Sequence, residues 1–390
     1  MFEYLGLHSI TPSALEQLHI LDFSRVLAGP FATMALADFG ATVTKVERPG
    51  TGDDTRSWGP PYDERGALST YFQSVNRNKS SVALDLADPA DLDRARRLAR
   101  ESDVVVENFR PGVMTKLGLD YESLRADNPG LIYCSITGFG GSEAGAALPG
   151  YDLLVQALGG LMSITGEPDG EPLKVGVALV DVITGLFAAV GILAALERRR
   201  EDGEGQLVEV DLLSSLLAAL VNQGSAFTLA GVTPARMGNR HPSIAPYELL
   251  DTGAGEIVVA VGNDRQFGEL CRVLGVSGLA EEERFATNPA RVANREALRP
   301  LLEQALAARS AGEWIELLTA CRVPVGRVND VGAAFAFAES IGLDPVVEIP
   351  RPDGSAARLT RNPIRLSRTP ATYRLPPPPL PPKPDAEESR

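Results

Sequence analysis

The feature that most constrains the fold of this chain is the alternation of short apolar runs with helix-like segments over its first 140 residues. Patterns typical of strands occupy residues 19–23, 41–47, 81–85, 103–106 and 131–136, and residues 29–39 and 89–100 have helical patterns. A strand, a helix and a second strand in this rhythm form a right-handed crossover with parallel strands. The sequence therefore predicts an α/β fold with a Rossmann-like parallel sheet, in which ligands bind at the carboxyl ends of the strands.

The pattern changes after residue 236. Before that point we expect helices over 185–200 and 212–229, with a strand at 207–210. Beyond it, a strand at 256–261 and helices over 266–274, 295–308 and 311–319 indicate a smaller α/β domain. Strand-like segments at 345–349 and 357–366 follow. The proline run from Leu375 can continue neither helix nor sheet, so we expect an extended and then disordered tail.

An excess of acidic residues argues against a nucleic-acid-binding protein. The chain has 51 Asp and Glu residues against 37 Lys and Arg, a net charge of −14, whereas nucleic-acid affinity depends on neutralising phosphates. Basic residues still concentrate in the N-terminal part, as a site for one polyanionic ligand or as an ordinary mixed-charge surface. They are Lys45, Arg48, Arg56, Arg77, Lys79, Arg110 and Lys116.

Several common kinds of site are missing. The three cysteines are widely separated and match no disulfide or zinc pattern, and the first residues lack the features of a signal peptide. With no uninterrupted apolar run of about 18 residues, we expect a cytoplasmic protein without a membrane span or a metal site. Residues 24–30 lack the glycine pattern of a dinucleotide site, and the motifs of serine hydrolases, zinc proteases and phosphate-binding loops do not occur.

Asp181 is the best candidate for chemistry. It lies between a small apolar run and the apolar helix expected from residue 185. An aspartate at such a junction is commonly an N-cap that accepts helix amide hydrogen bonds. The same amides would favour its ionised form and keep a nucleophilic carboxylate ready, so cap and nucleophile are compatible. Asp152 is a possible second member of the site, and Tyr151 either donates a hydrogen bond to an anionic intermediate or packs its ring.

Several collinear motifs resemble the class III CoA-transferases, the CaiB/BaiF family. They occupy residues 20–34, 40–50, 52–56, 76–79, 106–112 and 150–152, together with the segment of Asp181. The resemblance covers about residues 17–370, and chance does not explain so many motifs in the same order. Details of the first motifs and of residues 243–247 are most similar to the branch that transfers CoA from succinyl-CoA to glutarate.

The resemblance implies a covalent mechanism for Asp181. In the family this aspartate attacks an acyl-CoA thioester to give a mixed anhydride, and the released thiolate then forms an aspartyl-CoA thioester. An acceptor carboxylate reverses the sequence, so CoA is a substrate and no tightly bound cofactor is expected. Tyr151 stands where the related α-methylacyl-CoA racemases have a histidine, and tyrosine is a poor proton carrier near neutrality. Transferase is therefore favoured over the alternative, a racemase or isomerase of the same fold.

The resemblance also implies which residues contact the substrates. Those expected to bind CoA are Val26 and Ala28 in the pocket wall, Arg48 and Leu84 near adenine, Asn108 and Phe109 along the pantetheine, and Lys116 at a phosphate. The loop Gly238, Asn239, Arg240 and His241 is expected to contact the acceptor, with Arg240 or His241 pairing with the far carboxylate of a dicarboxylic acid. Leu27 replaces the glutamine of formyl-CoA transferases, which argues against formyl or oxalyl specificity.

The expected organisation follows from these observations together. Residues 1–225 form the large Rossmann-like domain with the catalytic aspartate, 226–335 the small α/β domain with the substrate loop, and 336–375 return to the large domain before the tail, 376–390. By resemblance the chain forms an interlocked homodimer. A rival of another class is a CoA-binding protein without turnover. The residues alone identify neither the donor acid nor the acceptor acid.

Overall fold

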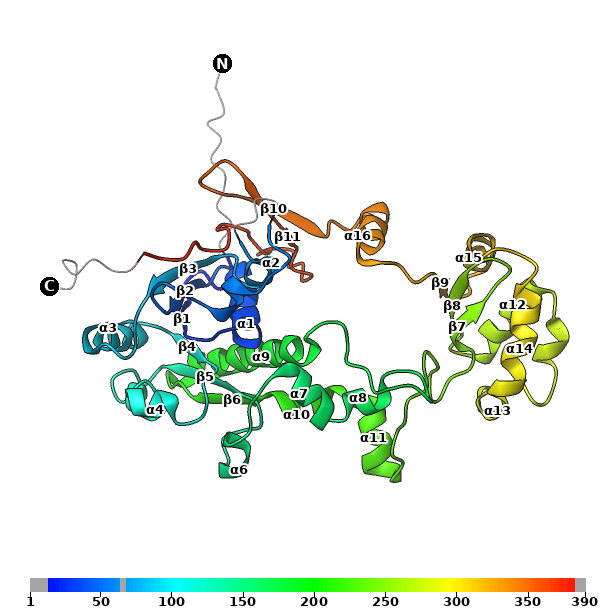
Figure 1. Cartoon of the computed structure of the whole chain (residues 1–390), viewed down its shortest axis with the longest axis horizontal. Coiled ribbons are helices and arrows are strands. Elements are labelled where there is room, and N and C mark those ends of the chain that lie inside the picture. The colour runs from blue at the N-terminus through cyan, green and yellow to red at the C-terminus, as the bar shows by residue number, and fades with distance from the viewer. Residues whose placement is uncertain (1–12, 64–67, 383–390) are drawn as a thin grey trace, which may run out of the picture. The chain divides into compact units, whose positions relative to one another are not determined.

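The computed structural model describes residues 13–63 and 68–382 (Figure 1). Chain contacts divide it into two compact units. The first holds the chain up to Gly159, the segment Val175–Ala230 and the chain from Asp344 onwards; the second holds Gly160–Lys174 and Gly231–Leu343. The first unit therefore contains both ends of the described chain, and its last segment starts at 344 where the sequence predicted 336.

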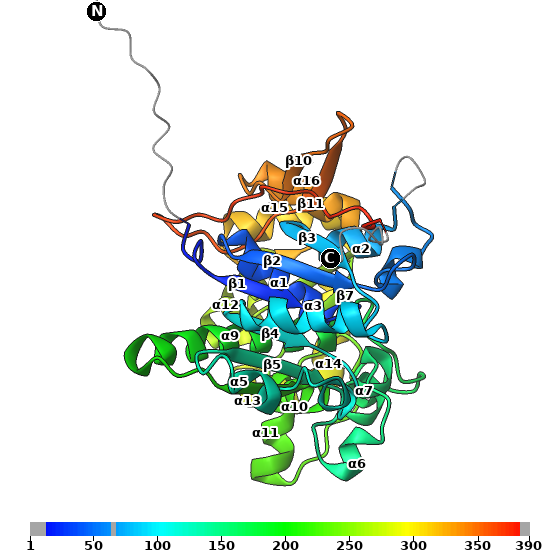
Figure 2. The ribbon, with the colours of Figure 1, turned by 90° about the vertical axis from the view of Figure 1, so that its left-hand side faces the viewer.

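Six parallel strands form the sheet of the first unit, in the order β3-β2-β1-β4-β5-β6. They are β1 (His19–Asp22), β2 (Thr42–Glu47), β3 (Lys79–Ala83), β4 (Val104–Glu107), β5 (Ile132–Thr137) and β6 (Leu207–Asp211). Figure 2 shows the first five one below another in this order. The strand order reverses between β1 and β4, which lie side by side although β2 and β3 come between them in sequence. Ligands of open α/β sheets bind at such a switch point.

Helices cover both faces of this sheet. On one face α3 (Pro89–Arg100), α4 (Val113–Leu117) and α5 (Tyr121–Arg125) share a buried cluster with Leu21, Val105 and Tyr133 of the strands. On the other face lie α1 (Ala28–Asp38) and α9 (Leu179–Asp202), which pack closely on each other. Gly185 makes this possible, because a Cβ there would lie 2.6 Å from the Ala28 carbonyl oxygen. The start of α9 is thereby held next to the turn that follows β1.

The remaining elements of the first unit are short. They are η1 (Asp54–Ser57), α2 (Thr70–Ser74), α6 (Glu143–Ala146), α7 (Asp152–Leu158), α10 (Leu212–Ala219), α11 (Val221–Ala230) and the antiparallel hairpin of β10 (Val346–Pro350) and β11 (Ala356–Thr360). The single helix expected over 212–229 is wrong, because α10 and α11 meet at a bend of 84° at Val221, which has a φ of 45°. Helix periodicity does not reveal one residue in the left-handed region.

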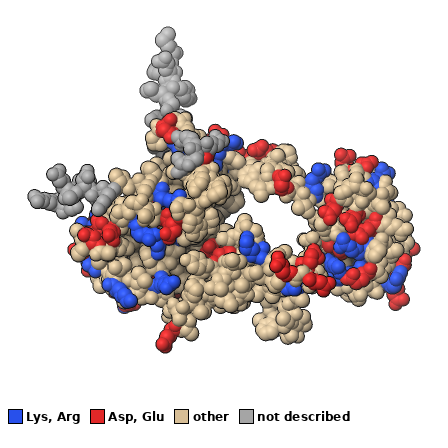
Figure 3. Space-filling model, viewed as in Figure 1, with Lys and Arg blue, Asp and Glu red and all other residues tan. Residues whose placement is uncertain are grey.

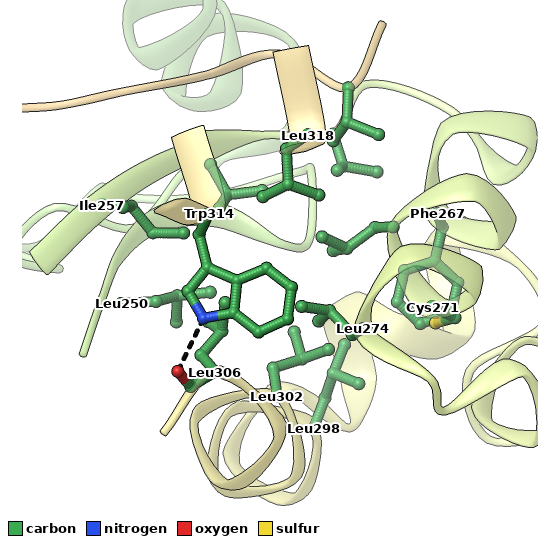
Figure 4. Close-up of a cluster of buried hydrophobic side chains, with 14 of the residues drawn as sticks. Leu250, Ile257, Phe267, Cys271, Leu274, Leu298, Leu302, Leu306, Trp314 and Leu318 are labelled. Carbon is green, nitrogen blue, oxygen red and sulfur yellow. Dashed lines mark hydrogen bonds between the residues drawn. The ribbon is translucent and has the colours of Figure 1, made fainter. Parts of the chain in front are cut away.

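The second unit has its own core around a three-stranded antiparallel sheet, β7 (Tyr247–Asp251), β8 (Glu256–Ala260) and β9 (Val325–Gly326). Trp314 lies at the centre of its leucine-rich cluster, and its indole N–H donates to the Leu306 carbonyl at 2.7 Å (Figure 4). A buried indole needs such a partner. The helices are α8 (Leu161–Ile164), α12 (Asp264–Leu274), η2 (Ser277–Ala280), α13 (Asn288–Ala293), α14 (Arg295–Leu306), α15 (Ala311–Ala320) and α16 (Val331–Ser340).

Helix α9 is long and apolar enough to cross a membrane when only length and composition are considered, and the bent pair α10–α11 passes the same test if it is counted as one span. Core helices pass this test as well. Here α9 packs against α1, α10 and the strands β5 and β6.

The proline-rich tail is extended, as expected, but the expectation of disorder is wrong for residues 376–382. Pro377 and Pro378 are buried. Asn78 anchors the segment, since its backbone N–H donates to the Leu375 carbonyl at 2.9 Å and its side-chain oxygen accepts the Arg374 N–H at 2.7 Å. Residues 383–390 lie outside the described part of the chain.

Candidate active site

Asp181 lies in the first turn of α9 and lines a cavity of about 210 Å³ in the first unit. The cavity lies where the turn after β1, the loop after β4 and the loop after β5 come together at the carboxyl ends of the strands. Val26, Ala28, Asn108 and Phe109 line it as well, and so does Tyr151. Most of the residues expected around the nucleophile and the pantetheine are therefore in one place.

The N-cap interpretation of Asp181 is wrong. The helix begins two residues before it, with Ala178 as N-cap and no side-chain cap of its own. Its first amides donate instead to Asp152, whose Oδ1 accepts from the Val180 N–H at 2.8 Å and the Asp181 N–H at 3.3 Å. A carboxylate from another helix thus satisfies the orphan donors of α9. The helix amides that were expected to favour the ionised form of Asp181 therefore donate to the Asp152 carboxylate and stabilise its charge.

Gln156 holds Asp152 in this orientation. Its Nε2 donates to Asp152 Oδ2 at 2.6 Å, and its Oε1 accepts from the Val175 N–H at 2.9 Å. Gln156 is fully buried. Both carboxylate oxygens of Asp152 therefore accept hydrogen bonds. The segment that leads into α9 is held by Gln156 as well, through the Val175 N–H. Sequence reasoning missed Gln156, because a glutamine one helical turn after an aspartate is equally typical of an ordinary helix position.

The environment of Asp181 favours its neutral form. Burial and then the nearby Asp152 carboxylate raise the pKa of Asp181 to about 7. Tyr71 of α2 is part of the same environment, because burial and then the charges of Asp181, Asp152 and Asp53 raise the pKa of its hydroxyl to about 12. Nothing in the sequence around Tyr71 distinguishes it from an ordinary packing residue.

The ionisation of Asp181 should control the pH dependence of the reaction. If Asp181 attacks as a carboxylate, as the resemblance implies, kcat/KM with an acyl-CoA donor should fall as the pH decreases through about 7. In Asp152→Asn the neighbouring charge is gone, so this acid limb should move to lower pH. A pH–rate profile of both proteins measures the shift; an unchanged limb would show that Asp152 does not act on Asp181.

A double variant separates charge from geometry in this experiment. In Asp152→Asn the amide nitrogen would face the Gln156 Nε2, which leaves two donors opposed. In Asp152→Asn/Gln156→Glu the glutamate carboxylate can accept hydrogen bonds from the asparagine amide and from the Val175 N–H, so the hydrogen bonds are restored. The negative charge then lies at position 156 and no longer at position 152 beside Asp181. The double variant should recover the rate that Asp152→Asn loses, and the acid limb of its pH–rate profile should still lie at lower pH than that of the wild type.

The turn Ser24–Ala28 is held in a strained conformation beside Asp181. Val26 has a φ of 70°, which costs a β-branched residue about 1–3 kcal/mol. Asp53 compensates, since its carboxylate accepts the Val26 N–H at 3.2 Å and pairs with the fully buried Lys45 Nζ at 2.9 Å. Lys45 also donates to the Ser24 carbonyl at 2.7 Å. The shape of the pocket wall therefore depends on a buried ion pair.

Asn108 and Phe109 are fixed by hydrogen bonds to the turn after β1 and to the end of β4. Asn108 pairs reciprocally with the backbone of Arg25, accepting its N–H at 2.8 Å and donating to its carbonyl at 2.7 Å. The Phe109 N–H donates to Glu107 at 2.8 Å, and burial raises the pKa of Glu107 to about 7. The loop after β4 is thus joined to the turn after β1 by the Asn108 side-chain amide.

Two glycines allow the loop after β5 to close the cavity. A Cβ at Gly150 would lie 2.6 Å from the Gly138 Cα, and a Cβ at Gly138 would lie 2.5 Å from the Gly150 Cα. The two ends of this loop, at Gly138 and Gly150, therefore contact each other through their backbones. Tyr151 follows directly, with 65% of its side chain exposed, so the packing alternative considered for its ring is wrong within this chain.

A second cavity, of about 290 Å³, adjoins the first. Arg48 and Leu84, the two residues that the resemblance assigns to adenine, line it together, and Arg25 and Phe109 line both cavities. Lys116 is exposed on α4, whose neighbouring residues Val113 and Leu117 line the second cavity, but it lines neither itself.

The expected substrate loop belongs to the second unit. Arg240 forms an ion pair with Glu296, and the His241 Nδ1 accepts the Ser243 N–H at 3.0 Å. Gly238 has a φ of 60° and donates its N–H to the Gly166 carbonyl at 3.0 Å, while Asn239 is exposed. Both candidate cations for a distal carboxylate thus have partners within their own unit.

In residues 13–63 and 68–382, no group of three or more His, Cys, Asp or Glu side chains is arranged to hold a metal ion. The site described above consists of a half-buried carboxyl, a neighbouring carboxylate that caps α9, and two cavities that share Arg25 and Phe109 in their walls.

Comparison with known families matches this chain to the model of CoA-transferase family III over residues 15–381. The chain belongs to CoA-transferase family III. The succinate–glutarate CoA-transferase of Agrobacterium fabrum is 44% identical over 375 residues, covering 94% of this chain and 92% of that protein. The human succinyl-CoA:glutarate CoA-transferase is 40% identical, covering 93% and 83%. This family III enzyme is therefore a CoA-transferase, with CoA as a substrate.

Solved structures agree with the family membership. The crystal structure of a CaiB/BaiF family protein from Brucella suis has a TM-score of 0.83 and 43% sequence identity to this transferase, covering 95% of this chain and 97% of that one.

Proposed function

We propose that Asp181 is the covalent nucleophile of this CoA-transferase. One observation carries the proposal: the family's position for the aspartate coincides with a carboxyl group that burial has shifted in pKa and that lines a cavity at the carboxyl ends of the strands. Such shifts concentrate at functional sites. The second cavity, which shares Arg25 and Phe109 with the first, offers room for the rest of a long ligand.

The reaction needs only bonds that the bound groups can make. An Asp181 oxygen attacks the donor thioester carbon, which releases CoA thiolate and leaves a mixed anhydride. The thiolate attacks the aspartyl carbonyl, expelling the donor carboxylate and forming an aspartyl-CoA thioester. The acceptor carboxylate attacks this thioester to give a second anhydride and thiolate, and the thiolate takes the acyl group and restores Asp181. Each step exchanges one acyl bond for another, so no external energy source is required.

The structure supports two sources of rate acceleration. Alignment of the carboxyl group in a cavity provides the entropic advantage of an intramolecular attack. The charge of Asp152, held by α9 amides and Gln156, destabilises the ionised form of Asp181 and makes its oxygen more basic than an ordinary aspartate. A more basic carboxylate attacks the thioester more readily, at the expense of a smaller ionised fraction at low pH.

The covalent step can be detected directly. The enzyme is incubated with acyl-CoA and then hydroxylamine, and intact mass and peptide mapping are used to locate a hydroxamate. Modification at Asp181 is the expected result. Modification at another carboxylate, with Asp181 unlabelled, would refute its role as the nucleophile.

We further infer a dicarboxylate acceptor and succinyl-CoA as donor. The support is the identity to succinate–glutarate and succinyl-CoA:glutarate CoA-transferases. An acetyl-CoA:oxalate CoA-transferase of Acetobacter aceti is also 40% identical, so the acceptor panel should include oxalate. Measured kcat/KM values for a series of mono- and dicarboxylic acids with succinyl-CoA would rank the acceptors, and a preference for monocarboxylates would contradict this inference.

The loop 238–241 provides a more specific prediction. We expect Arg240→Ala to raise KM for dicarboxylates by about tenfold, the value of one charge-assisted hydrogen bond, and to leave monocarboxylates unaffected. Because Arg240 pairs with Glu296, Glu296→Gln is the matched control and should lower KM for dicarboxylates or leave it unchanged. Equal losses for both classes of acid would remove Arg240 from acceptor recognition.

A homodimer is part of the proposal. Helices α9 and α11 expose large apolar side chains, namely Leu186, Phe187, Val190 and Leu193 on α9 and Val221, Phe227 and Leu229 on α11. In Figure 3 the part of the surface formed by α11 shows few charged atoms. Exposed apolar surface of this kind typically marks an interface. Light scattering should give a mass near twice 41.4 kDa; a monomer at micromolar concentration would contradict the dimer.

A further inference from the structure

The proline-rich segment, residues 375–382, lies against the loop that follows β2, residues 48–57. Arg56 of this loop donates from Nη2 to the Pro378 carbonyl at 3.1 Å and to the next carbonyl at 3.4 Å. Leu380 lines a third cavity, of about 600 Å³, together with residues of the same loop. A proline run has a fixed φ and no N–H groups, so it is ordered at little entropic cost and its carbonyl oxygens are free to accept from such a donor. The segment therefore makes a polar and an apolar contact with one loop.

Gly52 allows Leu380 to approach the backbone of this loop closely. A Cβ at Gly52 would lie 2.7 Å from the Leu380 Cδ1, 2.7 Å from the Arg56 Cδ and 2.6 Å from the Glu47 Oε2. The φ of Gly52 is 67°, in the left-handed region that favours glycine. The proline-rich segment, Arg56 and Glu47 therefore all pack against the same point of the loop.

The same loop forms part of the walls of both cavities described above. Arg48, Gly52 and Asp53 line the second cavity, and Asp54 lines the cavity with Asp181. No residue of the proline-rich segment lines either of them. A change in the conformation of the loop would therefore change the shape of both cavities, and the segment can act on them only through the loop.

Hydrogen bonds continue from the contact with the proline-rich segment to the turn after β1. Arg56 donates to both oxygens of Glu47, at 2.6 and 2.7 Å, and its guanidinium carbon lies 3.7 Å from the centre of the Phe72 ring. Glu47 in turn accepts the Asp53 N–H at 2.9 Å, and the Asp53 carboxylate accepts the Val26 N–H. The side chain that binds the Pro378 carbonyl is thus linked to the strained turn in the pocket wall.

We propose that the proline-rich segment is a positioning element for the acyl-CoA site, in which Leu380 and the Pro378 carbonyl hold the loop 48–57 in the conformation that forms the cavity walls. This inference rests on the proposed function and adds a role for a segment that touches neither cavity. Because the loop contributes to the walls and Asp181 to the chemistry, loss of the contact should raise KM for the acyl-CoA and leave kcat nearly unchanged.

The apolar contact is tested by two substitutions of Leu380. Leu380→Ser removes the side chain that packs on Gly52, and KM for succinyl-CoA should rise about fivefold, with kcat within about twofold of the wild type. Leu380→Met retains an apolar side chain of similar size and should keep the wild-type KM. Hydrogen–deuterium exchange of peptides that cover residues 48–57 reports on the loop itself, and exchange should be faster in Leu380→Ser and unchanged in Leu380→Met.

The polar contact is tested through Arg56. In Arg56→Lys the charge opposite Glu47 is kept, but a single ammonium group lacks the fork that reaches the carboxylate and the Pro378 carbonyl together. KM for succinyl-CoA should rise in this variant as well. Combined with Leu380→Ser, the increase should be smaller than the product of the two separate increases, because both substitutions release the same loop. An increase equal to that product would contradict the shared role.

Leu366→Ser is the matched control. Leu366 belongs to the same C-terminal part of the chain, is 39% exposed against 38% for Leu380, and lines none of the three cavities. It should change neither KM nor the exchange of residues 48–57. An unchanged KM or unchanged exchange in Leu380→Ser would overturn the positioning role while transfer by the wild type continued. A wild-type enzyme without CoA transfer would instead refute the proposed function.

Discussion

Replacing Asp181 by alanine should abolish CoA transfer, with kcat falling by at least about 10³-fold, because no other group can form the acyl bond. Alanine is a good helix former and leaves the start of α9, capped by Asp152, intact. CoA affinity should stay within about threefold of the wild type, since Asp181 does not line the second cavity, which is proposed to hold the rest of the ligand. Steady-state transfer assays and calorimetry measure the two quantities on the same preparation.

Two outcomes of this experiment would be informative against the mechanism. Substantial transfer by Asp181→Ala would mean that the acceptor attacks the donor thioester directly and that the covalent intermediates do not form. A loss of CoA affinity equal to the loss of rate would indicate a binding role for Asp181. Asp181→Asn is the matched control for shape, since it keeps the size of the side chain and lacks a nucleophilic oxygen of comparable basicity.

Loss of the Lys45–Asp53 pair should have the largest effect on stability. Lys45→Met leaves the Asp53 carboxylate buried without its cation, and breaking such a pair from one side typically costs about 3–5 kcal/mol. Although burial alone would lower the pKa of Lys45, the Asp22 and Asp53 carboxylates raise it above its usual value, so the amine is charged in the folded protein. Denaturant unfolding of the variant and the wild type measures the difference.

Lys45→Met should also weaken substrate binding. Asp53 also holds the Val26 N–H in its strained turn, so the pocket wall beside Asp181 should lose its shape and KM for the acyl-CoA should rise. Arg200→Met, which breaks the exposed pair with Glu197, should cost no more than about 1 kcal/mol. If Lys45→Met were equally mild, the buried pair would not be what stabilises this turn.

The parallel sheet could be predicted because its strands carry their own pattern. Apolar runs of four to seven residues separated by helices specify βαβ units locally, and all five expected strands of the first 140 residues match strands of the structure to within a few residues. Helix α1 begins one residue before its expected start. The reversal of strand order, which creates the site, depends on pairing between β1 and β4 across 80 residues and is not encoded in any local segment.

The hydrogen bonds of the site were less accessible from sequence. The position of Asp181 near a helix start was visible, but which carboxylate caps α9 depends on how α7 packs against it, and Asp152 lies 29 positions away. The sequence therefore placed Asp181 correctly near a helix start and gave the wrong source of its electrostatics. Tyr71 and Gln156 were missed because an aromatic and an amide side chain on short helices are ordinary packing residues until their partners are known.

The attachment of residues 372–379 to Asn78, just before β3, has a consequence for truncation experiments. Asn78 donates to the Thr372 and Leu375 carbonyls and accepts the Arg374 N–H, and the Arg56 guanidinium reaches the Pro378 carbonyl at 3.1 Å. A chain shortened to residue 371 would therefore leave these polar groups of the first unit without their partners, and the proline-rich segment is not a dispensable appendage of the fold.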